Sequence, residues 1–263
     1  MNLLSSLVRM REILRYRDLV LALVARELKV RYRRSTIGFL WTMLQPLLMM
    51  LVFSVVFSKL FRFPIDNYPV YALAGILFWN FFSQSIVSSM NSLRGNAQLL
   101  QKLPVPKAVF PIATVVSGVV NLLFALVPML AILVYREHRL SAALLFLPVS
   151  ILLATIFTLG AGLLLSPLAV FFSDTVELIG VLLTVLMYLT PLFYPIGALH
   201  GLAYTLVRFN PVRSVLEVFR DPIYNHKVPP LSHLSVSLGI ALLALAIGAY
   251  AFRKSSDRIP FYV

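Results

Sequence analysis

The fold is decided by one stretch, residues 26–46, which reads RELKVRYRRSTIGFLWTMLQP. Its first nine residues place five basic side chains against a single acid, Glu27. The hydrocarbon core of a bilayer, about 30 Å thick, excludes such a block. From Ile37 onward no ionisable residue appears before Lys59, and at about 1.5 Å per residue that run is long enough to cross a membrane as a helix. The stretch therefore predicts a membrane protein whose basic block stays in water or among lipid headgroups.

The composition supports a membrane protein over a soluble one. Of 263 residues, 60% are hydrophobic, whereas soluble domains contain about half. The net charge of +13 is spread between apolar runs and forms no basic face on a soluble domain, which argues against a nucleic-acid partner. The absence of cysteine excludes disulfides and thiolate metal sites.

Apolar runs of membrane length occur six times, and the fold class we expect is an all-α membrane protein with six transmembrane helices. The predicted spans are 37–61, 70–93, 112–135, 142–172, 176–194 and 231–252. They form one transmembrane domain, 37–252, between a basic N-terminal segment, 1–36, and a short tail, 253–263. Gly160, Gly162 and Pro167 in the fourth span indicate close helix packing or a bend near the end of that span.

The N-terminal segment is predicted to hold an amphipathic helix in the membrane surface. Leu21, Val24, Leu28 and Tyr32 recur at the spacing of one helical face, and basic residues occupy the remainder. This helix is either an anchor for the first span or a contact for lipid headgroups or another subunit.

A polar stripe runs along the second span, at Asn80, Gln84, Ser88 and Asn91. Polar groups that face lipid cost free energy, so the stripe should face protein or water. Two interpretations remain open: hydrogen bonds between packed helices, and a pore lining.

Two connecting segments contain structure of their own. After the second span, Gly95 and Asn96 end the helix, 97–103 can form a short helix, and three prolines (Pro104, Pro106 and Pro111) stop and restart the chain. Before the last span, the apolar pieces of 192–230 are too short to cross and are typical of re-entrant or interfacial helices.

Both termini are predicted to lie in the cytoplasm. With six crossings, the side that carries the termini holds 15 of the 23 Lys and Arg residues and the opposite side holds 8. Basic residues are enriched in cytoplasmic loops.

The sequence lacks the residue patterns expected for catalysis, ATP binding or ion-driven transport. The ten acids lie in loops or at span ends without a cluster, and no Gly is followed by Lys as an ATP-binding phosphate loop requires. The four histidines (His138, His200, His226 and His233) lie near loops without metal-site spacing, so no metal site is expected. No ionisable group lies at the centre of a span, which argues against a proton- or sodium-driven carrier. The chain is predicted to be no enzyme, with an energy source elsewhere.

The 26–46 stretch resembles the transmembrane subunit of ABC polysaccharide exporters. The matching residues are Arg26, Glu27, Leu28, Lys29, Arg31, Tyr32, Ser35, Gly38, Trp41 and Pro46. The resemblance implies a permease in the bacterial cytoplasmic membrane that pairs with a second copy of itself and with two ATP-binding subunits, which carry ATP and Mg. Its implied substrate is a lipid-linked polysaccharide of the O-antigen, capsule or teichoic acid type.

The resemblance also assigns roles to residues. Contacts with the ATP-binding subunit are expected at Arg94, Ala97, Leu100, Lys102, Lys107, Phe172 and Asp174. An interfacial motif is expected at Arg26, Glu27, Arg31, Tyr32 and Trp41. An outer gate is expected at Asn210, Pro211, Arg213, Glu217 and Arg220, with Asn210 and Pro211 forming the turn between two short helices.

The conduit for the polymer is expected on two helix faces. Sugars stack their C–H faces on aromatic rings, so a sliding path favours rings without deep binding sites. The faces that fit are Gln45, Met49, Phe53 and Phe57 on the first span and Thr184, Met187, Tyr188 and Tyr194 on the fifth. Such stripes also occur in plain helix packing, and it is the family resemblance that implies a channel lining here.

Three other functions were weighed. An ABC efflux permease for drugs or small lipids would share the topology but need no long aromatic path. A passive channel would need no cytoplasmic docking helix. A membrane-embedded enzyme would need the clustered carboxylates that the chain lacks.

Overall fold

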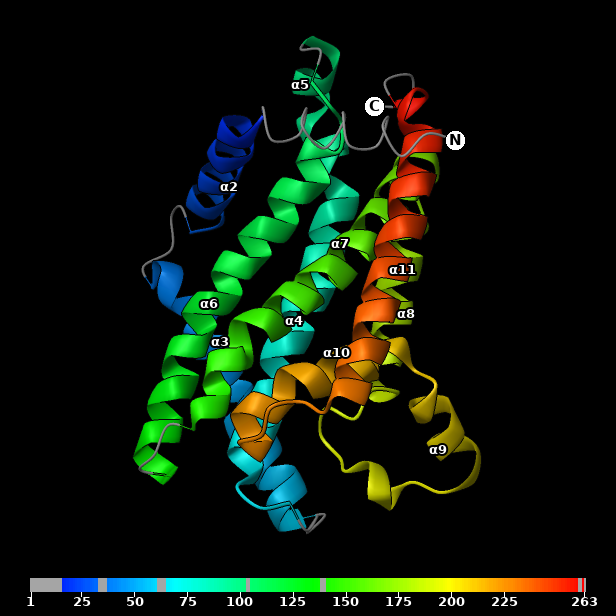
Figure 1. Cartoon of the computed structure of the whole chain (residues 1–263). Helices are drawn as coiled ribbons and strands as arrows, with labels where there is room; N and C mark the ends of the chain where they lie inside the picture. Colours follow the sequence, from blue (N-terminus) through cyan, green and yellow to red (C-terminus); the bar gives the residue numbers. More distant parts are fainter. Residues whose placement is uncertain are drawn as a thin grey trace.

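The structure, a computed structural model, describes residues 16–32, 37–60, 65–102, 105–137, 141–259 and 262. Several predicted features lie outside these ranges, namely residues 1–15, Ser35 of the motif, residue 103 of the predicted loop helix, Pro104 after it, and the end of the tail. The side chain of Tyr32 is likewise not described. Throughout the described ranges the regular structure is helical, with no strand (Figure 1).

In the described part of the chain, five helices are long and apolar enough to cross a membrane. Their cores are α3 (Trp41–Phe53), α4 (Tyr68–Ser92), α6 (Val109–Glu137), α7 (Leu147–Phe171) and α11 (Leu231–Ser256). The turns Gly38–Leu40 and Ser54–Leu60 extend α3, and Ala142–Phe146 precedes α7. These elements confirm five of the predicted spans to within a few residues. Pro111 lies in the first turn of α6, where its missing N–H costs nothing, in agreement with a restart of the helix there.

The fifth predicted span, 176–194, is shorter than expected. Helix α8 (Thr175–Tyr188) has 14 residues, or about 21 Å, against about 30 Å for the hydrocarbon core. It ends early because Pro191 disfavours helical backbone at Thr190 and has no N–H to donate. The Tyr194 hydroxyl then donates to the Tyr188 carbonyl at 2.7 Å, so the chain folds back on the helix end.

The long helices alternate in direction, and α8 follows the same alternation (Figure 1). One end of the bundle, which we call the α5 end, carries α5 (Ala97–Lys102) and the last turn of α11. Towards the other end lie two short helices, α9 (Gly201–Arg208) and α10 (Pro211–Arg220).

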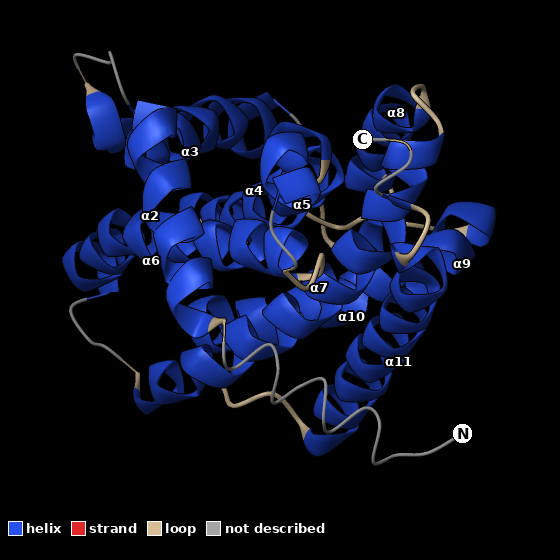
Figure 2. Ribbon diagram, turned by 90° about the horizontal axis from the view of Figure 1, so that it is seen from above, coloured by secondary structure: helices blue, strands red, loops and turns tan. Residues whose placement is uncertain are grey.

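Helix α2 (Arg17–Tyr32) packs along α6 (Figures 1 and 2). Leu23 and Val24 are buried in a cluster with Leu100 and Phe110, and Leu28 packs against it. Leu21 is exposed and lies outside this packed face, so its contact with the membrane surface stays a prediction.

Helices α7 and α11 cross in direct backbone contact. A Cβ atom at Gly248 would overlap the carbonyl group of Gly160, and one at Gly160 would overlap the backbone at Ala244 and Leu245. Small residues allow this approach, which maximises packing between membrane helices. The prediction of close packing at Gly160 is confirmed, while its partner Gly248 was not recognised from the sequence.

Replacing Gly248 with Ala should therefore destabilise the protein. The added methyl group forces α7 and α11 apart, and overpacking of this kind costs about 1–3 kcal/mol. Gly239→Ala on the same helix is the matched control, because a Cβ there meets nothing within 4 Å. We expect thermal unfolding in detergent to show a lower midpoint for Gly248→Ala than for Gly239→Ala; equal midpoints would contradict the packing.

Candidate functional site

The segment between α8 and α11 is held by the cap of α10. The Asn210 side-chain oxygen accepts from the Val212 N–H at 2.9 Å, as an N-cap does. Its amide nitrogen donates to the Leu189 carbonyl at 3.1 Å and contacts the Thr190 hydroxyl at 2.9 Å. Asn210 thus joins the beginning of α10 to the end of α8.

At the other end of α10, Arg220 is buried with only 5% of its surface exposed. Its guanidinium donates to the carbonyls of Pro191 at 2.8 Å and Leu192 at 3.1 Å. It also lies 3.9 Å from the centre of the Tyr71 ring. Among the described residues it forms no ion pair, so carbonyl dipoles and the ring face take the place of a counter-ion.

Two tyrosines of α4 complete the contacts to the same segment. The Tyr71 hydroxyl lies 2.9 Å from the Tyr194 carbonyl and 3.2 Å from that of Pro191, and the Tyr68 hydroxyl donates to the Phe193 carbonyl at 2.9 Å. All four consecutive carbonyls of residues 191–194 therefore accept hydrogen bonds from side chains. We call residues 190–194 the clamped segment.

Glycine makes room for this arrangement. A Cβ at Gly75 would lie 2.6 Å from an Arg220 terminal nitrogen and 3.0 Å from the Leu192 carbonyl oxygen. The Arg220 guanidinium therefore fits against α4 only because residue 75 has no side chain. This coupling of α4 to α10 was not recognised from the sequence, because no local pattern connects Gly75 to Arg220.

The five predicted gate residues all lie on α10 or its cap. Arg213 and Glu217 form an ion pair at 2.7 Å on the partly exposed face, and Asn210 with Pro211 forms the turn between α9 and α10. Asn210 and Arg220 are fixed by the contacts above. Their function as a gate stays a prediction.

The predicted conduit residues fall into two groups. Phe53 and Phe57 pack on Phe193, with ring centres 4.1 and 5.9 Å apart, and Tyr194 is hydrogen-bonded to α8. These rings contribute to packing within the protomer. In contrast, Met49, Thr184 and Tyr188 are exposed, the last at 65%, while Met187 is half-buried and Gln45 borders a polar cavity described below.

Helices α3 and α8, which both pack on α4, each present an apolar face outward. The exposed side chains are Leu48, Met49, Leu51, Val52 and Val55 on α3 and Leu178, Val181, Leu182, Val185 and Tyr188 on α8. Apolar faces of this size require lipid or another protein to cover them.

At the α5 end, predicted contacts for the ATP-binding subunit serve two purposes. Arg94 donates to the Val170 carbonyl at 3.3 Å and Lys107 to the Ser256 carbonyl at 2.5 Å, which satisfies the ends of α7 and α11. Leu100 is buried and Ala97 half-buried. Lys102, Phe172 and Asp174 remain exposed at this surface.

Two arginines of the predicted interfacial motif contact side chains of the protein itself. Arg26 donates to the Asn96 side chain at 2.5 Å, and Arg31 lies 3.6 Å from Glu27 and 3.5 Å from Gln84. Burial raises the pKa of the Glu27 carboxyl above its usual value. A hydrogen bond with Ser117 and the nearby arginines lower this pKa, but by less than burial raises it. Trp41 is 44% exposed at the beginning of α3.

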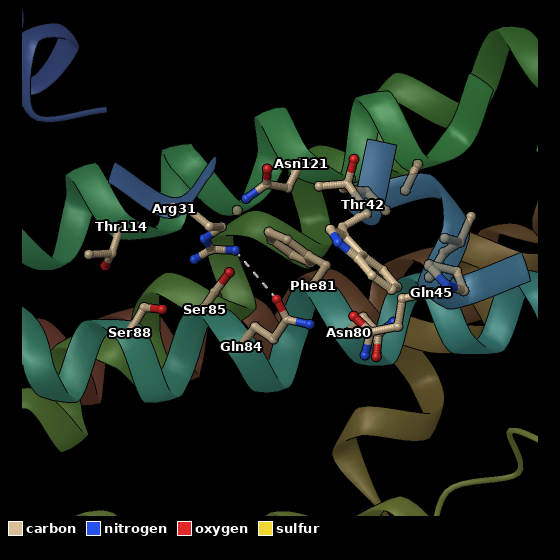
Figure 3. A pocket seen from close by; sticks show the side chains of 16 residues that line it. Arg31, Thr42, Gln45, Asn80, Phe81, Gln84, Ser85, Ser88, Thr114 and Asn121 are labelled. Atoms are coloured by element: carbon tan, nitrogen blue, oxygen red, sulfur yellow. Dashed lines mark hydrogen bonds between the residues drawn. The ribbon is translucent and has the colours of Figure 1, made fainter. Parts of the chain in front are cut away.

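The polar stripe of α4 lines a cavity of about 270 Å³ between α2, α3, α4 and α6 (Figure 3). Asn80, Gln84 and Ser88 face it, whereas Asn91 bonds to the Val87 carbonyl of its own helix. The hydrogen bond between α4 and α6 comes from Ser89, which meets the Thr114 hydroxyl at 2.9 Å. Gln84 of the stripe also reaches Arg31 of α2 at 3.5 Å, so the helix-packing and pore-lining interpretations both stay predictions.

Within the described part of the chain, no group of three or more His, Asp or Glu side chains is placed to hold a metal ion. The cavity and the clamped segment offer amides, hydroxyls, carbonyls and guanidinium groups. Groups of this kind can hydrogen-bond to polar molecules.

Comparison with known proteins identifies relatives along almost the whole chain. The family described as ABC-2 type transporter matches residues 18–224. The O-antigen export system permease protein RfbA of Myxococcus xanthus is 32% identical over 94% of this chain and 96% of its own length. RfbA of Klebsiella pneumoniae is 26% identical over 92% and 93%. The polysialic acid transport protein KpsM of Escherichia coli is 23% identical over 90% and 93%.

Replacing Arg220 with Gln should destabilise the fold, because it leaves the carbonyls of Pro191 and Leu192 without their charged donor. Hydrogen bonds from a charged group contribute about 1.5–3 kcal/mol, and we expect a loss of about 3 kcal/mol. Arg213→Gln, which removes the same charge from the same helix, should cost less than about 1 kcal/mol, as exposed pairs do. Denaturant or thermal unfolding in detergent measures the stability of both variants. Equal losses would show that the hydrogen bonds of Arg220 do not stabilise the fold.

Proposed function

The chain belongs to the ABC-2 type transporter family, and we propose that it is the permease subunit of an ATP-driven polysaccharide exporter. It moves a lipid-linked polysaccharide of the O-antigen, capsule or teichoic acid type outward across the bacterial cytoplasmic membrane. The observation that carries this proposal is the near full-length similarity to permeases that export O-antigen and polysialic acid. An efflux permease for drugs or small lipids and a passive channel have no comparable support.

The chain crosses the membrane six times in this proposal, with α8 and the clamped segment together forming the fifth crossing. Irregular backbone is tolerated at membrane depth only where its polar groups are satisfied. The four side-chain hydrogen bonds to residues 191–194 meet that condition. Both termini then lie in the cytoplasm, on the side with 15 of the 23 Lys and Arg residues.

A second copy of the chain completes the conduit. The apolar faces of α3 and α8 support a homodimer whose protomers enclose the path between them. Tyr188 provides an exposed ring on this surface and Thr184 a hydroxyl, which suit the C–H faces and hydroxyls of a sugar chain. Phe53 and Phe57, packed on Phe193, support this surface from behind.

Two ATP-binding subunits supply the energy and hold ATP and Mg. They dock at the α5 end, on α5 and the turn of residues 172–175. Lys102 is the exposed basic side chain of α5 and makes no hydrogen bond or ion pair in the described structure, so it is free to meet an acidic group of the partner. Arg94 and Lys107 instead brace the ends of α7 and α11.

Deleting the gene should abolish surface polysaccharide while the lipid-linked polymer accumulates inside the cell, because synthesis continues without export. Plasmid-borne wild-type protein should restore surface display. Immunoblots of surface and intracellular polymer measure both pools. Normal surface display in the deletion strain, with loss of resistance to small toxic compounds, would favour drug efflux instead.

Lys102→Glu separates coupling from folding in the same assay. The reversed charge should reduce export at least tenfold, as a loss of about 1.4 kcal/mol in subunit binding does, while the protein still inserts. Lys227→Glu makes the same change at an exposed position between α10 and α11, away from α5, and should leave export unchanged.

A further inference from the structure

The cavity beside α4 has the composition of a binding site. Each of its four walls contributes polar side chains: Arg31 from α2, Gln45 from α3, Asn80, Gln84 and Ser85 from α4, and Asn121 from α6 (Figure 3). Its volume of about 270 Å³ is near the lower end of the range for ligand sites. Polar groups gathered between membrane-length helices are costly unless they have partners, which makes the site a candidate for binding.

One buried hydroxyl in this cavity lacks a partner. Ser85 is 2% exposed, and its Oγ atom finds no hydrogen bond in the described part of the chain. This Oγ atom packs against the backbone of α6 at Gly118, where a Cβ atom would collide with it. Leaving a buried hydroxyl unsatisfied costs about 1–3 kcal/mol, which a bound ligand would recover.

Arg31 brings one positive charge to the cavity, and its contacts with neighbouring side chains are long. Arg31 reaches the Gln84 oxygen at 3.5 Å and the Glu27 carboxylate at 3.6 Å, both beyond the usual 2.7–3.2 Å of a hydrogen bond. A guanidinium has five N–H donors, so most of them remain available. No acidic side chain lines the cavity, so Arg31 gives its lining a net positive charge, which favours an anion.

The rim of the cavity marks its depth in the membrane. Trp41 borders the cavity and is 44% exposed at the beginning of α3. Tryptophan is enriched at the level of the lipid headgroups, and the basic α2 precedes this point in the chain. The opening therefore lies where lipid phosphates lie, and the apolar residues of α3 that follow lie at the depth of the acyl chains.

We propose that this cavity binds the phosphate group of a membrane lipid. Arg31 donates to the phosphate oxygens in the two-pronged geometry that guanidinium groups favour, and Ser85 with the side-chain amides of Asn80 and Gln84 donates from the cavity wall. Basic pockets between membrane helices bind anionic headgroups in this way. The proposal rests on the membrane location of the chain and does not depend on polysaccharide export.

The test is lipid retention by the purified full-length chain in complex with its ATP-binding subunits. After delipidation, phosphatidylglycerol is added and bound lipid is counted by native mass spectrometry. Arg31→Gln should reduce the bound fraction about tenfold, whereas Lys29→Gln, which removes the same charge from an exposed position two residues earlier, should change it less than twofold. Equal retention in Arg31→Gln and wild type would overturn the proposal.

Ser85→Ala provides a second test that does not depend on the stability of Arg31→Gln. It should reduce retention about threefold while the unfolding temperature stays equal or rises, because the variant removes an unpaired hydroxyl. A structural role alone would change the temperature and not the retention, and that result would contradict the proposal.

Two further ligands identify the source of the phosphate. Diacylglycerol, which lacks the phosphate, should not be retained, and retention equal to that of phosphatidylglycerol would overturn the proposal. Inorganic phosphate at millimolar concentration distinguishes the phosphate alone from the complete lipid. Displacement of phosphatidylglycerol assigns recognition to the phosphate group itself, and resistance to displacement shows that the acyl chains add to it; both support a phosphate site.

Discussion

A buried arginine that forms no ion pair with any described residue determines how the second half of this protein is arranged. Arg220 satisfies the carbonyls of Pro191 and Leu192 and lies on the ring of Tyr71. An irregular segment at membrane depth is stable only if its carbonyls have donors, and a guanidinium offers several from one side chain. The position of α10 and the requirement for glycine at residue 75 both follow from this contact.

The two ends of the bundle use cations differently. Towards α10, Arg220 and Asn210 fix irregular backbone, so this part of the protomer behaves as one body attached to α4. At the α5 end, Arg94 and Lys107 brace the ends of α7 and α11 and leave Lys102 exposed. A push delivered to α5 would pass into α7 and α11, which are in backbone contact at Gly160 and Gly248. In the proposed exporter, motion at the ATP-binding subunits thus reaches the far side through packed helices.

Much of the fold could be predicted because membrane helices obey strong rules of length and polarity. Five spans, the short helix α5 and the packing role of Gly160 followed from local residue patterns. The features that were missed depend on partners distant in sequence. Nothing near Arg220 indicates that it reaches Tyr71, and nothing near Phe53 indicates that Phe193 covers it. The stripe at Asn80, Gln84 and Ser88 was found from the sequence. The cavity was not, because its other walls contain Arg31 and Asn121, which come from other helices.

The central claim is that residues 190–194 form a fixed part of the protomer, and hydrogen exchange tests it most directly. The amides of Leu189, Thr190 and Leu192 are all hydrogen-bonded in the structure, to Val185, Met187 and Thr190 respectively. Mass spectrometry of the detergent-solubilised complex should show the peptide that covers 189–194 exchanging more slowly than the peptide that covers the exposed helix α9. Exchange of residues 189–194 within seconds, as fast as in α9 or faster, would contradict the account.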